Sequence, residues 1–423
     1  MKVAIIGGGI AGNVVAHRLH REHDITLYEA ASYLGGHTHT HTVEQAGRSW
    51  QVDTGFIVFN DRTYPNFIRL LSALGVASQQ SSMSFSVRDE ASGLEYNGTS
   101  LNSLFAQRRN LVRPRFLGMI RDILRFNREA PALLDEPGGE MPLGELLERG
   151  RYGRAFIEHY IVPMGAAIWS TDPASMLAFP ARFFVRFLHN HGMLTVDDRP
   201  TWHTIVGGSA RYVEKLSAPF RHRVRLATPV ESVRRMPGGV VVKARGLEAA
   251  HYDAAFLACH SDQALEMLAD PTAPEREVLR AIPYQRNEAV LHTDTRLMPR
   301  RRLAWAAWNY HLPQGGGGPA ALTYDMSCLQ RLDSPTPFLV TLNRGDEIDP
   351  AHVIKRIVYQ HPLYTPASVA AQARQRELNG PVRTYFCGAW WRNGFHEDGV
   401  VSALDAVTHF EQDHAERTLY RSA

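Results

Sequence analysis

The sequence is poor in cysteine and in long apolar runs, and each shortage excludes a class of protein. Its three cysteines, Cys259, Cys328 and Cys387, are far apart and form no C-x-x-C pair. This argues against a disulfide framework and against a cysteine-rich metal site, so a reducing cytoplasm fits best. No apolar run reaches the roughly 18 residues that span a bilayer. We therefore expect a cytoplasmic protein, with a peripheral position on the inner membrane as the alternative.

Lysine is also scarce. Of the 46 lysines and arginines, only four are lysines: Lys2, Lys215, Lys243 and Lys355. The formal net charge is +3, a balance that does not indicate a nucleic-acid-binding protein. Hydrophobic residues make up 44% and charged residues 21% of the chain, which is ordinary globular usage. At about 150 residues per domain, 423 residues predict two to three domains.

The N-terminal segment has the pattern of a nucleotide-binding fold. A β-branched run, Lys2 to Ile6, predicts a strand, and it is followed by the glycine-rich turn Gly7 to Gly12 and a helical pattern. A second apolar run, Ile25 to Tyr28, ends in Glu29. A strand, a glycine turn, a helix and a second strand ending in an acid are typical of a dinucleotide site. We favour this interpretation over a secretory signal peptide, which can also begin with a basic residue and an apolar stretch.

Each residue type in this turn has a physical reason. Gly7 permits a tight turn, Gly9 leaves room for a pyrophosphate, and Gly12 lets the helix pack close to the sheet. The start of the helix offers N–H groups to the phosphates. Glu29 would accept hydrogen bonds from ribose hydroxyls, and its charge disfavours a 2'-phosphate.

Further glycine blocks follow where a nicotinamide domain would continue as regular strand-helix repeats. They are Gly35 to Thr38, Asp53 to Phe56, Gly207 to Ser209 before a helical pattern, and Phe386 to Ala403 near the end. In this order they resemble the flavin-containing amine oxidase and phytoene desaturase superfamily. The nearest resemblance is to bacterial predicted NAD/FAD-binding amine-oxidase-like proteins, which are similar to the flavoprotein segment of plant cyclopropane fatty-acid synthases.

The resemblance implies FAD as the cofactor and an α/β fold. A Rossmann-like FAD-binding domain of the amine oxidase type would comprise residues 1–60, 200–270 and 378–423. A discontinuous α+β substrate domain would comprise residues 61–199, which we predict to be mostly helical, and 271–377. A final helix would point its N-terminus at the flavin, where its dipole stabilises negative charge on the reduced ring. The implied FAD contacts are Gly7, Gly9, Ala11, Gly12, Glu29, Gly35, Gly36, His37, Val230 through its backbone, Gly388, Glu397, Gly399 and Val400.

Three residues, His37, His39 and Phe395, are candidates for catalysis. His37, His39 and His41 alternate with threonines, so a strand here would place all three imidazoles on one face. Because no acid or cysteine partner is apparent, we expect no metal and a polar strand lining the flavin cavity. His37 or His39 would then orient the flavin or the substrate. Phe395 is the counterpart of the aromatic residue that guides the amine nitrogen in amine oxidases, with core packing as the alternative.

The segment Arg108 to Arg128 carries seven arginines, and Pro114 would start a helix there. Apolar residues recur on one side of this helix and arginines on another. A basic amphipathic helix of this kind can lie on an anionic lipid surface. The other interpretation is an ordinary surface helix that covers the core.

The resemblance implies a flavoenzyme, and its relatives in bacteria accompany methylases that act on unsaturated phospholipid acyl chains. Our leading hypothesis is an FAD-dependent oxidoreductase that dehydrogenates an unsaturated or methyl-branched fatty acyl chain by hydride transfer to flavin N5. The missing lysine favours it, because amine oxidases often use a lysine near N5. The alternatives are an amine oxidase that produces imine and hydrogen peroxide, a flavin-dependent double-bond isomerase, and a non-catalytic flavin-binding partner of a lipid methylase.

Overall fold

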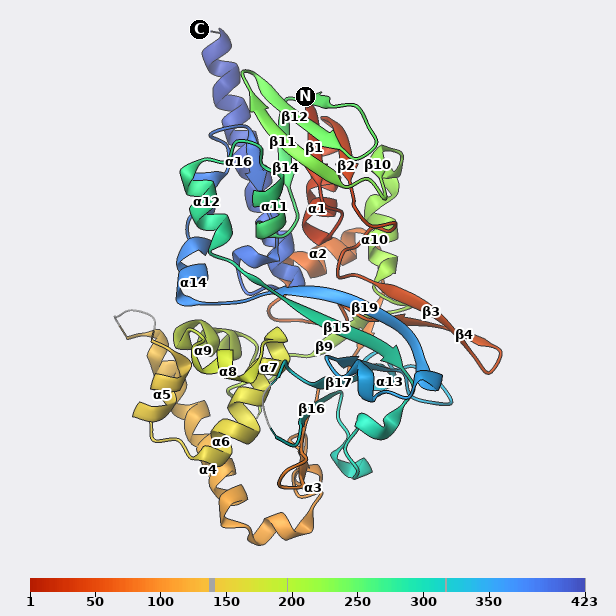
Figure 1. Cartoon of the computed structure of the whole chain (residues 1–423), viewed down its shortest axis with the longest axis vertical. Helices are drawn as coiled ribbons and strands as arrows, with labels where there is room; N and C mark the ends of the chain where they lie inside the picture. Colours follow the sequence, from red (N-terminus) through yellow and green to blue (C-terminus); the bar gives the residue numbers. More distant parts are fainter. Residues whose placement is uncertain (137–140, 196, 316–317, 423) are drawn as a thin grey trace.

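The computed structural model describes residues 1–136, 141–195, 197–315 and 318–422. Figure 1 shows an elongated molecule in which both termini lie at the upper end. The upper part contains a parallel sheet with helices around it, and the lower part contains α3 to α9. Two long strands, β15 and β19, cross the middle between these parts.

The upper part is built on a five-stranded sheet in the order β10-β2-β1-β14-β20, and all of its pairings are parallel. Parallel sheets need cover on both faces, which explains why these strands are almost wholly apolar. This arrangement confirms the predicted α/β fold. The strands are β1 Lys2–Ile6, β2 Asp24–Tyr28, β10 Val224–Arg225, β14 Ala254–Leu257 and β20 Thr384–Phe386.

Helices α1 (Ile10–Leu19), α10 (Ala210–Ser217) and α16 (His396–Ser422) share one hydrophobic core with this sheet. Residues of α1 and α16 contact each other along this core. The second core of the sheet lies against a three-stranded antiparallel sheet, whose Val233, Val240 and Val242 are buried there. That sheet consists of β11 Val230–Met236, β12 Gly239–Ala244 and β13 Ala250–Tyr252.

A seven-stranded sheet, in the order β19-β15-β18-β17-β16-β7-β8, forms the lower part. Strands β7 and β16 pair in parallel, and the other pairings are antiparallel. Strands β7 and β8 come from the segment that we predicted to be mostly helical. The strands are β7 Phe85–Asp89, β8 Leu94–Asn97, β15 Tyr284–His292, β16 Trp308–Leu312, β17 Leu322–Asp325, β18 Leu339–Leu342 and β19 Val353–Pro362.

Helices pack on this sheet through a core that contains Phe116, Phe156, Trp169 and Phe184 together with Tyr310 of the sheet. The aromatic side chains fill the space between these helices, several of which are short. These helices are α3 Leu101–Leu104, α4 Pro114–Glu129, α5 Leu143–Arg149, α6 Arg154–Phe156, α7 Val162–Trp169, α8 Pro173–Leu177 and α9 Ala181–Asn190.

Some segments that we assigned to the substrate domain pack on the upper part. Phe67 and Leu71 of α2 lie in the core around α1, and Val278 of α12 lies in the core beneath β11 and β12. Ala371 and Leu378 join that second core. These helices are α2 Pro65–Ala73, α12 Ala273–Arg280, α14 Pro366–Gln372 and α15 Gln375–Leu378.

The connections between the two parts are short antiparallel pairings. One is the hairpin of β3 and β4, and another is the small sheet β5-β9-β6. Two further short helices complete the elements used below. The bounds are β3 Thr40–Gln45, β4 Arg48–Asp53, β5 Phe59–Asn60, β6 Ser78–Gln80, β9 Trp202–Ile205, α11 Ser261–Met267 and α13 Met326–Leu329.

Candidate active site

The turn between β1 and α1 is closely packed at two glycines and open at a third. Gly7 has φ +106°, and a Cβ there would lie 2.5 Å from the carbonyl oxygen of Ala258. A Cβ at Gly12 would lie only 1.9 Å from the carbonyl oxygen of Gly7. At Gly9, by contrast, an added Cβ would meet no atom within 4 Å. Gly7 and Gly12 therefore let helix and strand approach, whereas Gly9 borders a space that suits a pyrophosphate. Ala11 is buried in the core around α1, so its contact with FAD stays a prediction.

Glu29 lies at the end of β2 beside this turn. Its carboxylate accepts hydrogen bonds from the backbone N–H of Gly8 at 2.6 Å and of Ala31 at 2.7 Å. A carboxylate has about four acceptor positions, so it keeps capacity for ribose hydroxyls. The chain that enters β11 lies alongside, because Thr228 N–H donates to the Glu29 carbonyl at 2.9 Å. Val230, the predicted adenine contact, follows directly.

The second glycine block lies on the first. Gly35 N–H donates to the carbonyl of Gly8 at 2.8 Å, and a Cβ at Gly36 would lie 3.2 Å from the Cα of Gly9. A Cβ at Gly55 would lie 2.1 Å from the carbonyl oxygen of His37. Backbone segments that are far apart in the sequence thus meet where a side chain would separate them.

The start of α16 lies beside the start of α1. A Cβ at Gly399 would lie 2.7 Å from Cγ2 of Ile10, and Val400 is buried in the core of the parallel sheet. Gly388 precedes this helix, and its N–H donates to Ser402 Oγ at 3.0 Å. Two helix N-termini therefore converge, and each favours a negatively charged group.

Glu397 has partners that its sequence position did not indicate. Its carboxylate accepts hydrogen bonds from Asn66 N–H at 3.0 Å, from Asn66 Nδ2 at 2.6 Å and from Phe67 N–H at 2.8 Å. These groups belong to the first turn of α2, so Glu397 caps that helix. Its contact with FAD stays a prediction.

His37 is buried against β19. Its ring centroid lies 5.0 Å from that of Tyr359, 5.3 Å from that of His361 and 6.3 Å from that of His260. Burial lowers the pKa of His37 to about 4 and that of His361 to about 3, so both rings are neutral near pH 7. Within the described part of the chain, Nε2 of His37 is buried without a hydrogen-bond partner. This unpaired nitrogen and the space at Gly9 fit a bound cofactor.

His39 lies in a separate stack. Its ring centroid is 4.2 Å from that of Tyr33 and 4.1 Å from that of His41. Strand β3 begins only at Thr40, so the expected single face with three imidazoles is wrong: the rings of His39 and His41 lie in contact at a tilt of 48°, while His37 turns toward β19. Burial lowers the pKa of His39 to about 4. Among the residues that the structure describes, no group of three or more histidines, cysteines or acids is placed to hold a metal.

Phe395 lies at the border between the two parts. It is half-buried and packs against both the core around the parallel sheet and the core of the lower helices. Its ring centroid lies 5.0 Å from that of Phe187 and 6.1 Å from that of His191. The predicted aromatic residue thus stands just before α16, where upper and lower parts meet.

Two buried acids organise the site: Asp398, which sequence reasoning passed over, and Asp53, which begins one of the predicted glycine blocks. Asp398 accepts a hydrogen bond from Phe395 N–H at 2.9 Å, and burial raises its pKa to about 7. Asp53 accepts from Ser209 N–H at 2.9 Å and from Ser209 Oγ at 2.7 Å, which ties β4 to the start of α10. The position of Asp398 in the first turn of the final helix was the available signal, because acids are favoured there.

The fold and these glycine contacts are those of a dinucleotide-binding protein, in which a cofactor would lie between Glu29 and the start of α16. The family model described as flavin containing amine oxidoreductase matches residues 10–349. The chain belongs to this family, and it is an FAD-dependent oxidoreductase. The predicted FAD cofactor is thereby confirmed, whereas the individual contact and catalytic residues stay predictions.

Solved structures with the same fold cover almost the whole chain. A cyclohexylamine oxidase from Brevibacterium oxydans IH-35A is 15% identical, with a TM-score of 0.69, covering 97% of this chain and 99% of its own. A putrescine oxidase is 16% identical, with a TM-score of 0.66 and coverages of 96% and 99%. A fatty acid isomerase from P. acnes that produces CLA is 16% identical, with a TM-score of 0.65 and coverages of 96% and 98%. No curated protein matches this chain.

Within the described ranges of the structure, none of the helices combines the length and the apolar character that crossing a bilayer requires.

Proposed function

We propose that this oxidoreductase acts on a hydrophobic substrate and dehydrogenates an unsaturated or methyl-branched fatty acyl chain. The observation that carries the proposal is the placement of the lysines. Lys2, Lys215 and Lys355 are exposed. The half-buried Lys243 of β12 donates to the carbonyl of Leu247, between β12 and β13. Lys355 is close enough to His39 for its charge to lower the pKa of that imidazole. In the proposed reaction, none of the four takes the role of the lysine that amine oxidases often place near flavin N5.

The surroundings of Phe395 support an apolar substrate. Phe187 stacks on Phe395, and the ring of Trp169 lies 4.8 Å from that of Phe187. His191 stacks on Phe187 at 3.9 Å, and burial lowers the pKa of His191 to about 4. Near pH 7 this aromatic group carries no charge. A substrate site bordered by these uncharged rings would suit a hydrocarbon chain.

Dehydrogenation removes two hydrogens from the substrate, one as a hydride and one as a proton. When bound, FAD supplies the hydride acceptor for the substrate C–H bond. The second hydrogen leaves as a proton, which the neutral imidazole of His37 or His39 can accept. The start of α16 stabilises the negative charge that reduction generates, and oxygen or another acceptor takes the electrons away.

An anaerobic reduction assay tests the proposal. The oxidised holoenzyme is mixed with unsaturated acyl lipids, with methyl-branched acyl lipids and with a panel of amines, and loss of the oxidised flavin absorbance is followed. We expect acyl lipids to bleach the flavin and to gain a double bond. Bleaching by amines alone would overturn the proposal in favour of amine oxidation. A double bond that moves without net flavin reduction would instead identify an isomerase, and flavin that nothing reduces would favour the non-catalytic partner.

Three neighbouring histidines provide matched variants for this assay. His37→Asn and His39→Asn remove the two proposed proton acceptors, and each is expected to slow flavin reduction at least about 100-fold if it serves as the base. His41→Asn changes the ring whose centroid lies 4.1 Å from that of His39, and it should change the rate less than about twofold. Equal rates for all three variants would refute the assignment of the base to this pair.

A further inference from the structure

The lower end of the molecule carries a surface on which exposed aliphatic side chains and arginines alternate. It comprises α3, the turn 108–112, the first half of α4 and the turn 300–303, and α3 and α4 lie at this end in Figure 1. Residues of α3 also contact those of the turn that begins at Arg302. The exposed fraction is 80% for Val112 and 77% for Leu101. The other exposed aliphatic residues are Leu111, Leu117 and Leu303.

This surface is strongly positive. Residues 96–121 and 297–324 contain neither aspartate nor glutamate. Across the described residues, only Arg115 of the seven surface arginines forms an ion pair, with Glu158 at 3.3 Å. The positive charge is therefore not neutralised by the chain itself. The seven are Arg108, Arg109, Arg113, Arg115, Arg300, Arg301 and Arg302.

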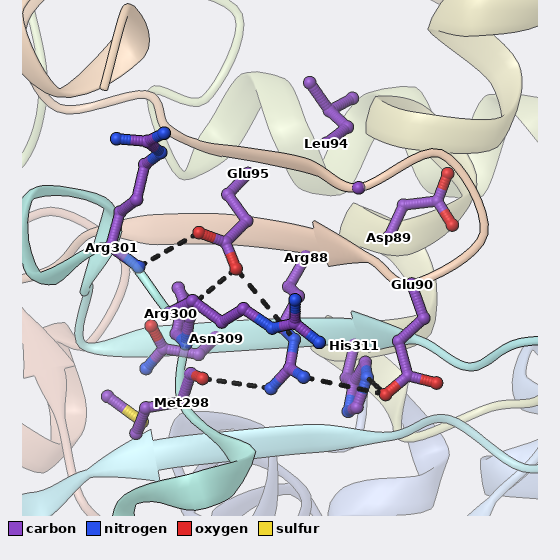
Figure 2. Close-up of polar contacts among 12 residues, drawn as sticks. Arg88, Asp89, Glu90, Leu94, Glu95, Met298, Arg300, Arg301, Asn309 and His311 are labelled. Carbon is purple, nitrogen blue, oxygen red and sulfur yellow. Dashed lines mark hydrogen bonds and ion pairs between the residues drawn. The ribbon is translucent and has the colours of Figure 1, made fainter. Parts of the chain in front are cut away.

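The turn with the three consecutive arginines is held in place by a buried acid (Figure 2). Glu95 of β8 accepts hydrogen bonds from the backbone N–H of Arg300 at 2.8 Å and of Arg301 at 3.0 Å. Arg88 lies beside Glu95 and donates to the carbonyl of Met298 at 3.0 Å. Because Glu95 binds the backbone, the guanidinium groups of Arg300 and Arg301 stay exposed on an ordered turn.

Helix α4 satisfies both interpretations of its sequence, one on each face. Phe116 and Met119 are buried in the lower core, which fixes the inner face. Leu117, Arg121 and Leu124 are exposed on the outer face, at a spacing of four and three residues. An exposed stripe that alternates leucine with arginine is typical of a helix that lies in a membrane interface.

We infer that this surface docks the enzyme on an anionic phospholipid bilayer. Arginines would pair with lipid phosphates, and Leu101, Leu111 and Val112 would enter the region between headgroups and acyl chains. The exposed apolar residues are aliphatic, whereas single-stranded nucleic acid is bound by stacking on aromatic rings. The inference goes beyond the proposed reaction, since docking does not depend on which bond the enzyme oxidises.

Co-sedimentation of the holoenzyme with vesicles tests this inference. The vesicles contain phosphatidylcholine alone or phosphatidylcholine with about one third phosphatidylglycerol, at low and at high salt. We expect binding to the anionic vesicles that weakens as salt rises, and little binding to the neutral ones. Equal binding to both kinds of vesicle, or no binding to either, would overturn the inference. Salt-dependent binding to a nucleic acid without vesicle binding would assign the surface to another partner.

Matched variants distinguish the effect of this surface on vesicle binding from the effect of the protein's net charge. Arg108, Arg109, Arg300 and Arg301 are changed together to glutamine, and each lost arginine lowers vesicle binding about fivefold, so at least a 100-fold loss is expected. The control changes four exposed arginines of the upper part to glutamine: Arg18, Arg21, Arg234 and Arg280. This control should lose less than about threefold. A control that loses as much as the variant would contradict a localised surface.

A second pair of variants tests the aliphatic side chains. Leu111→Ser with Val112→Ser should weaken vesicle binding about tenfold, because two side chains no longer leave water. Val206→Ser with Leu247→Ser makes the same kind of change at exposed positions of the upper part, and binding should hold. Unchanged binding in the first variant would refute insertion of these residues, and thermal unfolding of every variant checks that the fold is intact.

Discussion

The two parts of the molecule are held together in different ways. Around the parallel sheet, backbone atoms approach each other at glycines, as Gly12 does with Gly7 and Gly55 with His37. In the lower part, side chains fill the space, and buried charged groups such as Glu95 fix the turns. The difference shows that the part around the parallel sheet depends on positions that lack a side chain, whereas the lower part depends on particular side chains. Changes at single positions should therefore damage the two parts by different mechanisms.

Acid is expected to cause the largest loss of stability, because buried neutral histidines lie at the border and in both parts. Their pKa values in the fold lie well below the unfolded value of about 6.5, so the unfolded chain binds protons first as pH falls. Their contribution is complete above about pH 6.5 and is lost on the way to about pH 4. The histidines, with pKa values of about 3 or 4, are His37, His260, His361, His396, His191, His292 and His311.

Two buried carboxyls act in the opposite direction. Burial raises the pKa of Asp53 to about 6 and that of Asp398 to about 7, so each destabilises the fold as pH rises above about 4. Because the histidines outnumber these acids, we expect a net loss of several kcal/mol between about pH 6.5 and pH 4. Urea unfolding across this range measures it. A free energy of unfolding that is flat or rises on acidification would contradict the expectation.

Gly12→Ala should have the next largest effect and should act on the cofactor part. Its Cβ would lie 1.9 Å from a backbone oxygen that cannot move aside, so we expect a loss of about 3 kcal/mol and less bound FAD. Gly118→Ala is the matched control in helix α4, because a Cβ there meets nothing within 4 Å. That control should gain up to about 1 kcal/mol. Urea unfolding and the ratio of flavin to protein report both effects, and equal outcomes would refute the role of close packing.

Glu95→Ala tests the lower part in the same way. The change leaves two backbone N–H groups without their acceptor and removes the 4.0 Å ion pair with the largely buried Arg88, so a loss of about 3 kcal/mol is expected. Flavin content of the folded protein should not change, in contrast to Gly12→Ala. Glu148→Ala, at an exposed position, should lie within about 0.5 kcal/mol of the parent protein. Loss of flavin from folded Glu95→Ala would show that the two parts are not specified separately.

Glu397→Ala should have the smallest of these effects and sharpens the comparison at the border. If Glu397 acts by capping α2, its loss costs about 1 to 2 kcal/mol in the FAD-free and FAD-bound protein alike. Glu411→Ala, on the same helix at an exposed position, serves as the control. Calorimetric unfolding with and without FAD separates the cases. A loss confined to the FAD-bound protein would assign Glu397 to the cofactor instead.

Prediction from sequence succeeded where a short motif constrains the backbone. The turn from Gly7 to Gly12 and the acid at Glu29 lie where their spacing indicated, because neighbouring residues on a strand, turn and helix determine that geometry. It failed where partners are distant. His37 was expected beside His39 and His41, but it packs on Tyr359 of β19 instead. The sequence also did not indicate that the carboxylate of Glu397 binds the start of α2, and the contact of Glu397 with FAD stays a prediction.

The lower part shows the same limit. Strands β7 and β8 were included in a segment predicted to be mostly helical, and the pairing of β7 with β16 depends on residues more than two hundred positions away. The helix that Pro114 begins was correctly predicted from its apolar spacing. Its solvent-exposed face could not be identified as part of a larger surface, because the turn 300–303 reaches it only in the fold.

The sequence by itself determined the cofactor and the family, because glycine blocks record where backbone must approach backbone or a bound group, and this requirement is local. Tertiary structure alone decided which distant groups meet: His37 packs on Tyr359 of β19, and Phe395 packs on Phe187 of α9. It also decided that arginines from two distant segments form one surface at the end of the molecule. These arrangements depend on contacts between residues far apart in the chain, and no spacing within the sequence encodes such distances.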